Sequence, residues 1–344
     1  MVDKGCAAHY TFNTSLMRLV SFEDPVRQSR IGALVPDGRI VDLHSACALY
    51  LRDVEHESAF YRLAEALVPP NMRALFLGGD TSLEAARKAL DYVLHDDSIP
   101  GPRGEAIFYS ADEITLKAPI IPTKFLSSVS DVREPSEPGS VFYRNVDAII
   151  AHDEPVINPE HLTQELDCGV ELALAVKKSG KHFTADEAAD YIGGYVIFND
   201  ITARDIQRRE LKSGVFGLCK GIETFCPLGP WIVTADEIPD LRNLTMELRV
   251  NGESRQRGRC GQMSARIPEM LSRYSPMGYN AGDLVSAGSA LGISSLVPDQ
   301  KIRFLKTGDV MECEIENIGV LRNQIISWEQ AYGRKPMSLI AQET

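Results

Sequence analysis

The stretch GYVIFNDITARDIQRRE (residues 194–210) joins a strand pattern to a helix pattern, and this junction decides the fold of the second half of the chain. β-Branched and aromatic residues run up to Asn199-Asp200, and polar, helix-like sequence follows. Asp200, Arg204 and Gln207 are spaced by four and three residues, so they fall within about 60° of one helical face. An acid, a guanidinium and an amide there could hold a metal and a carboxylate or carbonyl substrate. Spacing alone favours a simpler interpretation, a solvated face with an i, i+4 ion pair.

Strand-like runs recur on both sides of this junction. Short turns separate several of them, including Val250-Asn251-Gly252-Glu253, and the runs cover residues 170–176, 194–200, 230–237, 244–250, 283–288 and 310–316. A capping box of Thr184 and Glu187 predicts one helix, and a shorter helix is predicted at roughly 264–273. Many short strands with few helices predict a β-rich α+β domain and not a doubly wound sheet.

The N-terminal third combines a hairpin pattern with two helix patterns, and this difference from the rest of the chain predicts a separate small domain. A hairpin is expected over residues 30–43, where two apolar runs flank the turn residues Pro36-Asp37-Gly38. Helices are expected at 57–67 and 81–95, the second with a capping box of Thr81 and Glu84. The predicted organisation is a flexible extension (1–16), a small domain (17–118), a larger domain (119–334) and a tail (335–344), with the boundary in the Pro-containing segment 117–125.

Composition excludes several functional classes. Lys plus Arg is 36 and Asp plus Glu is 48, a net charge of −12 that disfavours binding to nucleic acid or to an anionic membrane surface. No run of 18 apolar residues and no secretory signal pattern is found, and the seven cysteines form no CxxC pair, so we expect a cytoplasmic protein with reduced thiols. The seven histidines show no metal-ligand spacing, and no P-loop, GxGxxG, HExxH or GxSxG motif occurs.

Two further residues stand out for their surroundings. Glu171 interrupts the apolar strand LDCGVELALAV (166–176), on the same side as Asp167 and Gly169. Asp167 and Glu171 would lie about 13 Å apart, too far to share an ion directly. Glu171 is therefore either buried at a site or on an exposed strand face. Lys220, in CKGIETFCPLGPWIVT (219–234), could neutralise an enolate or a carboxylate, or it could simply be solvated.

Taken together, these stretches resemble the fumarylacetoacetate hydrolase family from about Phe142 to Asn323. The matching blocks are Phe142-Tyr143, ELDCGVELALAV, GYVIFNDITARDIQRRE, KGIETFCPLGPWIVTADEI, VNGE at 250–253, the Gly-Asp at 282–283 and FLKTGDVMECEIENIGVLRN at 304–323. The resemblance implies a mixed β-roll with a small N-terminal α/β domain, a homodimer, and Mg²⁺ or a similar divalent cation.

The resemblance also implies roles for individual residues. Glu171 and Asp200 would be metal ligands, and Glu171 would also belong to the catalytic set. Arg204, Gln207 and Lys220 would contact the substrate or stabilise a developing oxyanion. The expected substrate-binding set is completed by Tyr143, Arg144 and Ser289.

The chain departs from the family pattern at three elements of one site. Gly169 stands where the first Glu of a Glu-x-Glu metal motif belongs. The loop that usually carries a catalytic His reads SVSDVREPSEPGSVFY (128–143) and contains none; Asp131 is the upstream residue there that could restore a third metal ligand. A Gly-Thr-Pro-like turn reads Gly288-Ser289-Ala290, and Glu223 follows Lys220 where an Asp is usual. We therefore expect a weakened or absent metal site.

These features predict an enzyme that acts on a β-diketo or 2-oxo acid through an enol or enolate. Hydrolytic C–C cleavage is the family default, and an isomerase, decarboxylase or dehydratase is the alternative, because each of these needs less water activation than hydrolysis. A non-catalytic scaffold or binding protein that kept the fold is a further alternative. The site is predicted where the end of strand 194–200, strand 170–176 and the Lys220 segment converge.

Overall fold

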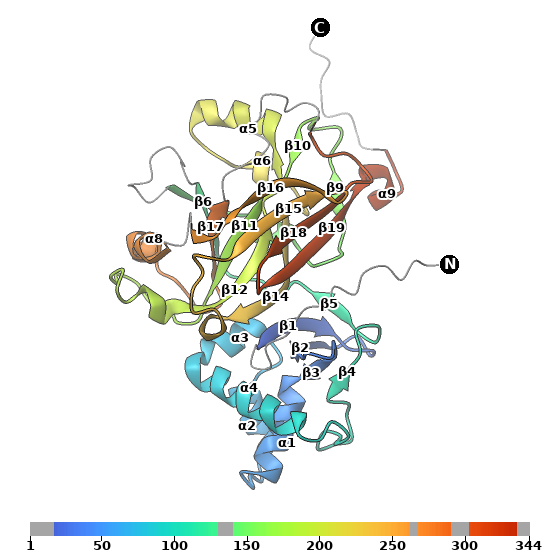
Figure 1. Ribbon diagram of the computed structural model, residues 1–344, viewed down its shortest axis with the longest axis vertical. Helices are drawn as coiled ribbons and strands as arrows, with labels where there is room; N and C mark the ends of the chain where they lie inside the picture. The colour runs from blue at the N-terminus through green and yellow to red at the C-terminus, as the bar shows by residue number, and fades with distance from the viewer. Residues whose placement is uncertain (1–16, 130–139, 262–266, 290–302, 336–344) are drawn as a thin grey trace.

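The structure is a computed structural model that describes residues 17–129, 140–261, 267–289 and 303–335 (Figure 1). The predicted extension (1–16) and nearly all of the predicted tail (335–344) lie outside these residues, as does Asp131. The strands are β1 (Arg18–Glu23), β2 (Ser29–Leu34), β3 (Ile40–Asp42), β4 (Phe108–Tyr109), β5 (Thr115–Lys117), β6 (Phe125–Val129), β7 (Ser140–Tyr143), β8 (Ile149–Ile150), β9 (Val156–Asn158), β10 (Leu166–Asp167), β11 (Val170–Val176), β12 (Ile192–Asn199), β13 (Thr202–Ala203), β14 (Cys226–Thr234), β15 (Thr245–Val250), β16 (Glu253–Arg259), β17 (Leu284–Ser289), β18 (Val310–Ile315) and β19 (Gly319–Ser327). The α-helices are α1 (Leu43–Asp53), α2 (Phe60–Leu67), α3 (Met72–Leu77), α4 (Gly79–Leu94), α5 (Arg204–Glu210), α6 (Leu218–Gly221), α8 (Ile267–Tyr274) and α9 (Trp328–Tyr332).

A long mixed sheet runs through the molecule, with the strand order β4-β3-β2-β1-β14-β12-β11-β17-β6-β7. A second sheet, in the order β16-β15-β18-β19-β9, lies across it (Figure 1). Leu172 and Ile197 of the long sheet pack against Leu248, Cys313 and Leu321 of the second sheet in one buried cluster. This β-rich α+β architecture confirms the predicted fold class.

The opposite face of the long sheet is covered by the N-terminal helices. Ala173 and Val196 share a buried cluster with Leu49 of α1 and Ala86 of α4. Strand β11 is thus buried on both faces, and all of its residues are buried. This double burial explains why VELALAV is a nearly continuous apolar run without polar alternation.

The N-terminal lobe contains β1–β5 and α1–α4, below the β-roll in Figure 1. Strand β1 pairs with β14, with Arg18 opposite Val233, so the long sheet runs without interruption from this lobe into the main body. The predicted boundary at residues 118–119 falls between β5 and β6. The predicted hairpin over residues 30–43 is confirmed as the β2–β3 pair, with Gly38 at φ 89° in its turn.

Strands were predicted more accurately than helices. The six strand runs of the larger domain correspond to β11, β12, β14, β15, β17 and β18. The turn at 250–253 is confirmed, with positive φ at both Asn251 (53°) and Gly252 (78°). The capping box of Thr81 is wrong, because α4 begins at Gly79, directly after α3. Thr184 donates to Glu187 from its backbone N–H (2.8 Å) and from its hydroxyl (2.9 Å), but a short 3₁₀ turn follows and not an α-helix.

The described cysteines and helices agree with the expectations from composition. The six cysteines found there are free and buried, which agrees with small apolar core residues. Within residues 17–129, 140–261, 267–289 and 303–335, no helix combines the length and apolarity that a membrane span requires.

Candidate active site

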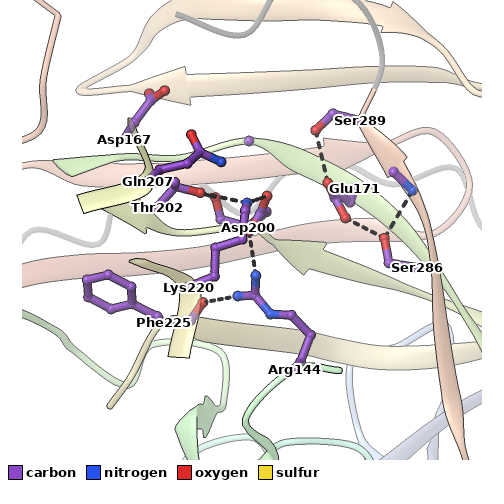
Figure 2. Close-up of polar contacts among 12 residues, drawn as sticks. Arg144, Asp167, Glu171, Asp200, Thr202, Gln207, Lys220, Phe225, Ser286 and Ser289 are labelled. Atoms are coloured by element: carbon purple, nitrogen blue, oxygen red, sulfur yellow. Dashed lines mark hydrogen bonds and ion pairs between the residues drawn. The ribbon is translucent and has the colours of Figure 1, made fainter. Parts of the chain in front are cut away.

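Two carboxylates lie close together where strand β12 ends and strand β11 begins, at one end of these neighbouring interior strands of the long sheet. Glu171 lies opposite Phe198 in the antiparallel β11–β12 pair, two residues before Asp200. The backbone N–H of Asp200 donates to the carbonyl oxygen of Gly169 at 2.9 Å, so these two residues are cross-strand neighbours. Helix α6 places Lys220 at the same strand ends, so the three segments expected from the sequence lie together (Figure 2).

Asp200 lies between the cationic side chains of Arg144 and Lys220 in a cluster with little solvent exposure. Nη1 of Arg144 donates to Oδ1 of Asp200 at 2.7 Å, and Nζ of Lys220 donates to Oδ2. Nζ of Lys220 also donates to Oγ1 of Thr202 at 2.8 Å. The side chains of Arg144, Lys220 and Asp200 are only 0%, 8% and 13% exposed. Charges that are shielded from water interact strongly, so this cluster fixes the lysine ammonium in place.

The guanidinium of Arg144 also contacts Phe225 and Cys226, at the start of β14. Nη2 donates to the carbonyl oxygen of Phe225 at 2.9 Å and contacts Sγ of Cys226 at 3.2 Å, and Nε lies 3.4 Å from the same sulfur. Direct contact between Arg144 and the substrate stays a prediction. Its complete burial favours a positioning role, in which it orients Asp200.

The electrostatics of the cluster follow from burial and pairing. Burial alone would raise the pKa of Asp200, but the positive charges of Lys220 and Arg144 outweigh it and lower this pKa to about 2. Burial lowers the pKa of Lys220, and the negative charge of Asp200 offsets part of that effect. Asp200 is therefore ionised at neutral pH.

Glu171 occupies a distinct part of the same site. It is 4% exposed, its Oε2 accepts a hydrogen bond from the hydroxyl of Ser286, and Oγ of Ser289 lies 3.4 Å from Oε1 (Figure 2). Burial, followed by the negative charge of Asp200, raises the pKa of Glu171 to about 7, although Lys220 counteracts this. The alternative of an exposed strand face is wrong. A carboxyl group with this pKa exists in both protonation states near neutral pH, so it can accept and return a proton.

Arg204 is oriented by a different set of contacts than the spacing suggested. Its Nε donates to Oδ2 of Asp167 at 2.8 Å, and its Nη1 donates to Oε1 of Gln207 at 2.8 Å. The expected helical face that includes Asp200 is wrong, because helix α5 begins only at Arg204, after the short strand β13. The i, i+4 ion pair is wrong for the same reason: Asp200 pairs with Arg144 and Lys220 instead.

The remaining expected site residues differ in their surroundings. Tyr143, at the end of β7, is 55% exposed, and Ser289 contributes its hydroxyl beside Glu171. Thr202 and Ser286 were missed by sequence reasoning. A signal for Thr202 was present, since it lies in the same NDIT segment as Asp200, whereas Ser286 lies in an apolar strand without any distinguishing pattern.

The donor set that the described residues provide at this site does not fit a divalent cation. No group of three or more His, Cys, Asp or Glu side chains suited to a metal occurs in the described part of the chain. Both oxygens of Asp200 already accept from cationic groups, and both oxygens of Glu171 face serine hydroxyls. Mg²⁺ requires about six oxygen ligands in near-octahedral geometry, usually with one or two carboxylates.

Arg144, Glu171, Asp200 and Lys220 thus form one largely buried cluster of charged side chains where β11 begins and β12 ends. Residues 123–326 match the family model described as "Fumarylacetoacetate (FAA) hydrolase C-terminal". The chain belongs to the fumarylacetoacetate hydrolase family.

Relatives support the assignment over most of the chain. Oxaloacetate tautomerase YisK of Bacillus subtilis (strain 168) is 31% identical over 86% of this chain and 95% of its own length. The human mitochondrial oxaloacetate tautomerase FAHD2A is 33% identical over 75% of this chain and 81% of its own length. A crystal structure of 5-carboxymethyl-2-hydroxymuconate delta-isomerase from Mycobacterium smegmatis has a TM-score of 0.64 and 25% identity, and the match covers 90% of this chain and all of that one.

A further solved structure shares the fold. Maleylpyruvate hydrolase from Sphingobium sp. SYK-6, in complex with manganese(II) ion and pyruvate, has a TM-score of 0.64 and 22% identity over 90% of this chain and 99% of that chain. The family assignment and the tautomerase relatives make this chain an enzyme that acts on small molecules through enol chemistry.

Proposed function

We propose that this enzyme catalyses keto–enol tautomerisation of a 2-oxo dicarboxylic acid of the oxaloacetate type. The carrying observation is the ammonium group of Lys220, held by Asp200 and Thr202 inside a nearly dry cluster. A lysine ammonium has three N–H donors, and these two contacts use two of them. Among the described residues the third makes no hydrogen bond, and we assign it to the oxygen that becomes an enolate. The two tautomerase relatives support this reaction and this substrate class.

In this proposal the substrate carboxylates bind at Arg204 and Gln207. Arg204 is oriented by Asp167 and Gln207 through Nε and Nη1, and its side chain is 13% exposed. Guanidinium groups bind carboxylates with good geometry, and a pre-oriented guanidinium loses little freedom on binding. Tyr143 and Ser289 stay predicted contacts.

Glu171 is proposed to transfer the proton. The C–H bond next to the carbonyl breaks, its proton moves to the carboxylate of Glu171, its electron pair forms the C=C bond of the enolate, and the π pair of the carbonyl moves onto the oxygen. Lys220 then gives a proton to that oxygen and regains one from solvent, while Glu171 loses its proton to solvent. No atom is gained or lost, so the step is an isomerisation.

Hydrolytic C–C cleavage, the default implied by the resemblance, needs an activated water. The hydrogen bonds and ion pairs of Lys220, Asp200 and Glu171 within the described residues involve no histidine. Tautomerisation needs a proton acceptor and a stabilised enolate but no activated water. The geometry therefore favours tautomerisation, and hydrolysis is an outcome that the experiment must detect. A homodimer stays a prediction.

The test follows oxaloacetate by proton NMR in D₂O, with EDTA present, for the wild-type protein and for Lys220→Met. The proposal expects faster exchange of the C3 protons and faster disappearance of the enol signal, both lost in the variant. Lys212→Met is the matched control, because Lys212 is an exposed lysine on the turn after α5. Formation of pyruvate or of another cleavage product without accelerated exchange would contradict tautomerisation.

A further inference from the structure

The site contains two positive side chains where a cation-binding centre would need free oxygen atoms. Asp200 has one oxygen on Arg144 and the other on Lys220, and both cations are buried. Together with Glu171, the cluster contains two carboxylates and two cationic side chains, so its charges can balance without any ion. A divalent cation at this position would meet two fixed positive charges at short range.

Gly169 accounts for the missing oxygen ligand. Its carbonyl accepts from the backbone N–H of Asp200, so a side chain at position 169 would lie beside Asp200. A Cβ built there would lie 3.0 Å from Oγ of Ser289, which is itself 3.4 Å from Oε1 of Glu171. Position 169 therefore faces the side on which Glu171 lies, and glycine supplies nothing to it.

The same position can accommodate a Cβ atom after a small shift of Ser289. The other atom near such a Cβ is Oε1 of Gln256, at 3.9 Å, an ordinary contact distance. The backbone of Gly169 is not among the positive-φ glycines, so a side chain there would not be strained by conformation. The hydroxyl of Ser289 needs to move by only a few tenths of an ångström.

We infer that this enzyme stabilises its enolate without a divalent cation: the Arg144–Asp200–Lys220 cluster replaces the ion, and Gly169 determines this metal independence. Lys220 supplies the donor and the positive charge at the oxygen. Asp200 holds the ammonium, and Arg144 holds Asp200. This inference rests on the proposed function for the identity of the oxyanion but concerns metal binding, which is measured separately.

The first experiment measures Mn²⁺ binding by electron paramagnetic resonance, with thermal melting as a second readout. Wild-type protein, Gly169→Glu and the size control Gly169→Ala are compared. We expect Gly169→Glu to bind Mn²⁺ at least about tenfold more tightly than wild type and to be stabilised by it, because it gains a carboxylate ligand. Gly169→Ala should behave like wild type. Wild-type protein that binds Mn²⁺ as tightly as Gly169→Glu would overturn the inference.

The second experiment uses oxalate, a dianion that resembles an enolate carboxylate, and measures its affinity by calorimetry. In the wild-type protein, EDTA should change the dissociation constant by less than about twofold. Lys220→Met should weaken binding about 10- to 100-fold, the usual range for a lost hydrogen bond to a charged group. Loss of oxalate binding in EDTA that Mn²⁺ restores, or no oxalate binding under any condition, would overturn the inference. Oxalate binding in EDTA without tautomerisation would instead refute the proposed function alone.

Discussion

Arg204 and Asp167 form an ion pair, with 2.8 Å between Nε and Oδ2, that links helix α5 to strand β10. The carboxylate of Asp167 is 2% exposed, and the guanidinium is 13% exposed. Nη1 of Arg204 is used by Gln207, and within the described residues Nη2 forms no hydrogen bond. The ion pair thus fixes the orientation of the guanidinium, which in the proposed function receives a substrate carboxylate.

Asp167→Asn is expected to raise KM by about tenfold and to change kcat less. The variant keeps a hydrogen bond but loses its charge, and charge-assisted bonds are roughly twice as strong as neutral ones. Steady-state kinetics on the tautomerisation reaction provide the measurement. Glu165→Gln is the matched control, because Glu165 pairs with Arg208, which is 56% exposed. Equal effects of the two substitutions on KM would contradict a role for Asp167 in orienting Arg204.

Arg144→Met is expected to lower the free energy of unfolding by about 3–5 kcal/mol. Removal of Arg144 from this buried charge cluster leaves Oδ1 of Asp200 without its cationic partner, while Lys220 still pairs with Oδ2. Urea denaturation at neutral pH measures the effect. For comparison, Arg322→Met removes an ion pair with Asp153 in which both side chains are about half exposed, and it should cost less than about 1 kcal/mol. A loss below 1 kcal/mol for Arg144→Met would show that the cluster is not held by this residue.

The free energy of unfolding of the wild-type protein, relative to that of Glu171→Gln, should fall as the pH rises from about 4.5 to above 7. The pKa of Glu171 is raised from 4.5 to about 7 in the folded state, so its contribution is fully present below 4.5 and is lost as the pH passes through 7. The expected loss is on the order of 3 kcal/mol relative to Glu171→Gln, whose amide does not titrate. Denaturation curves for both proteins between pH 4.5 and 8 give this difference. A constant difference over that range would contradict the raised pKa.

The fold was predictable because its strands carry strong local signals. VELALAV is apolar on both faces since β11 is covered on both sides, and the Asn251-Gly252 turn requires two positive φ angles that this pair adopts readily. Helix starts were less predictable. Thr81 and Glu84 satisfy a capping pattern, but the direct succession of α3 and α4 moves the start of α4 to Gly79.

The site residues were partly predictable, and their partners were not. The motifs indicated Glu171, Asp200, Arg204 and Lys220, and in the structure these residues lie near one another where β12 ends and β11 begins. Spacing suggested that Asp200 would pair with Arg204, four residues later. The real partner of Arg204 is Asp167, 37 residues earlier in the chain, and pairings over such separations are set by tertiary packing, which local periodicity does not encode.

The central claim is that the ammonium of Lys220 stabilises an enolate. Its most direct test is kcat for oxaloacetate tautomerisation by Lys220→Met in EDTA, with circular dichroism to establish that the variant is folded. Loss of one pre-oriented donor to an oxyanion costs about 2.7–4 kcal/mol, so the account predicts a kcat about 10² to 10³ times lower than that of the wild-type protein. A folded Lys220→Met variant with near-normal turnover would contradict the account.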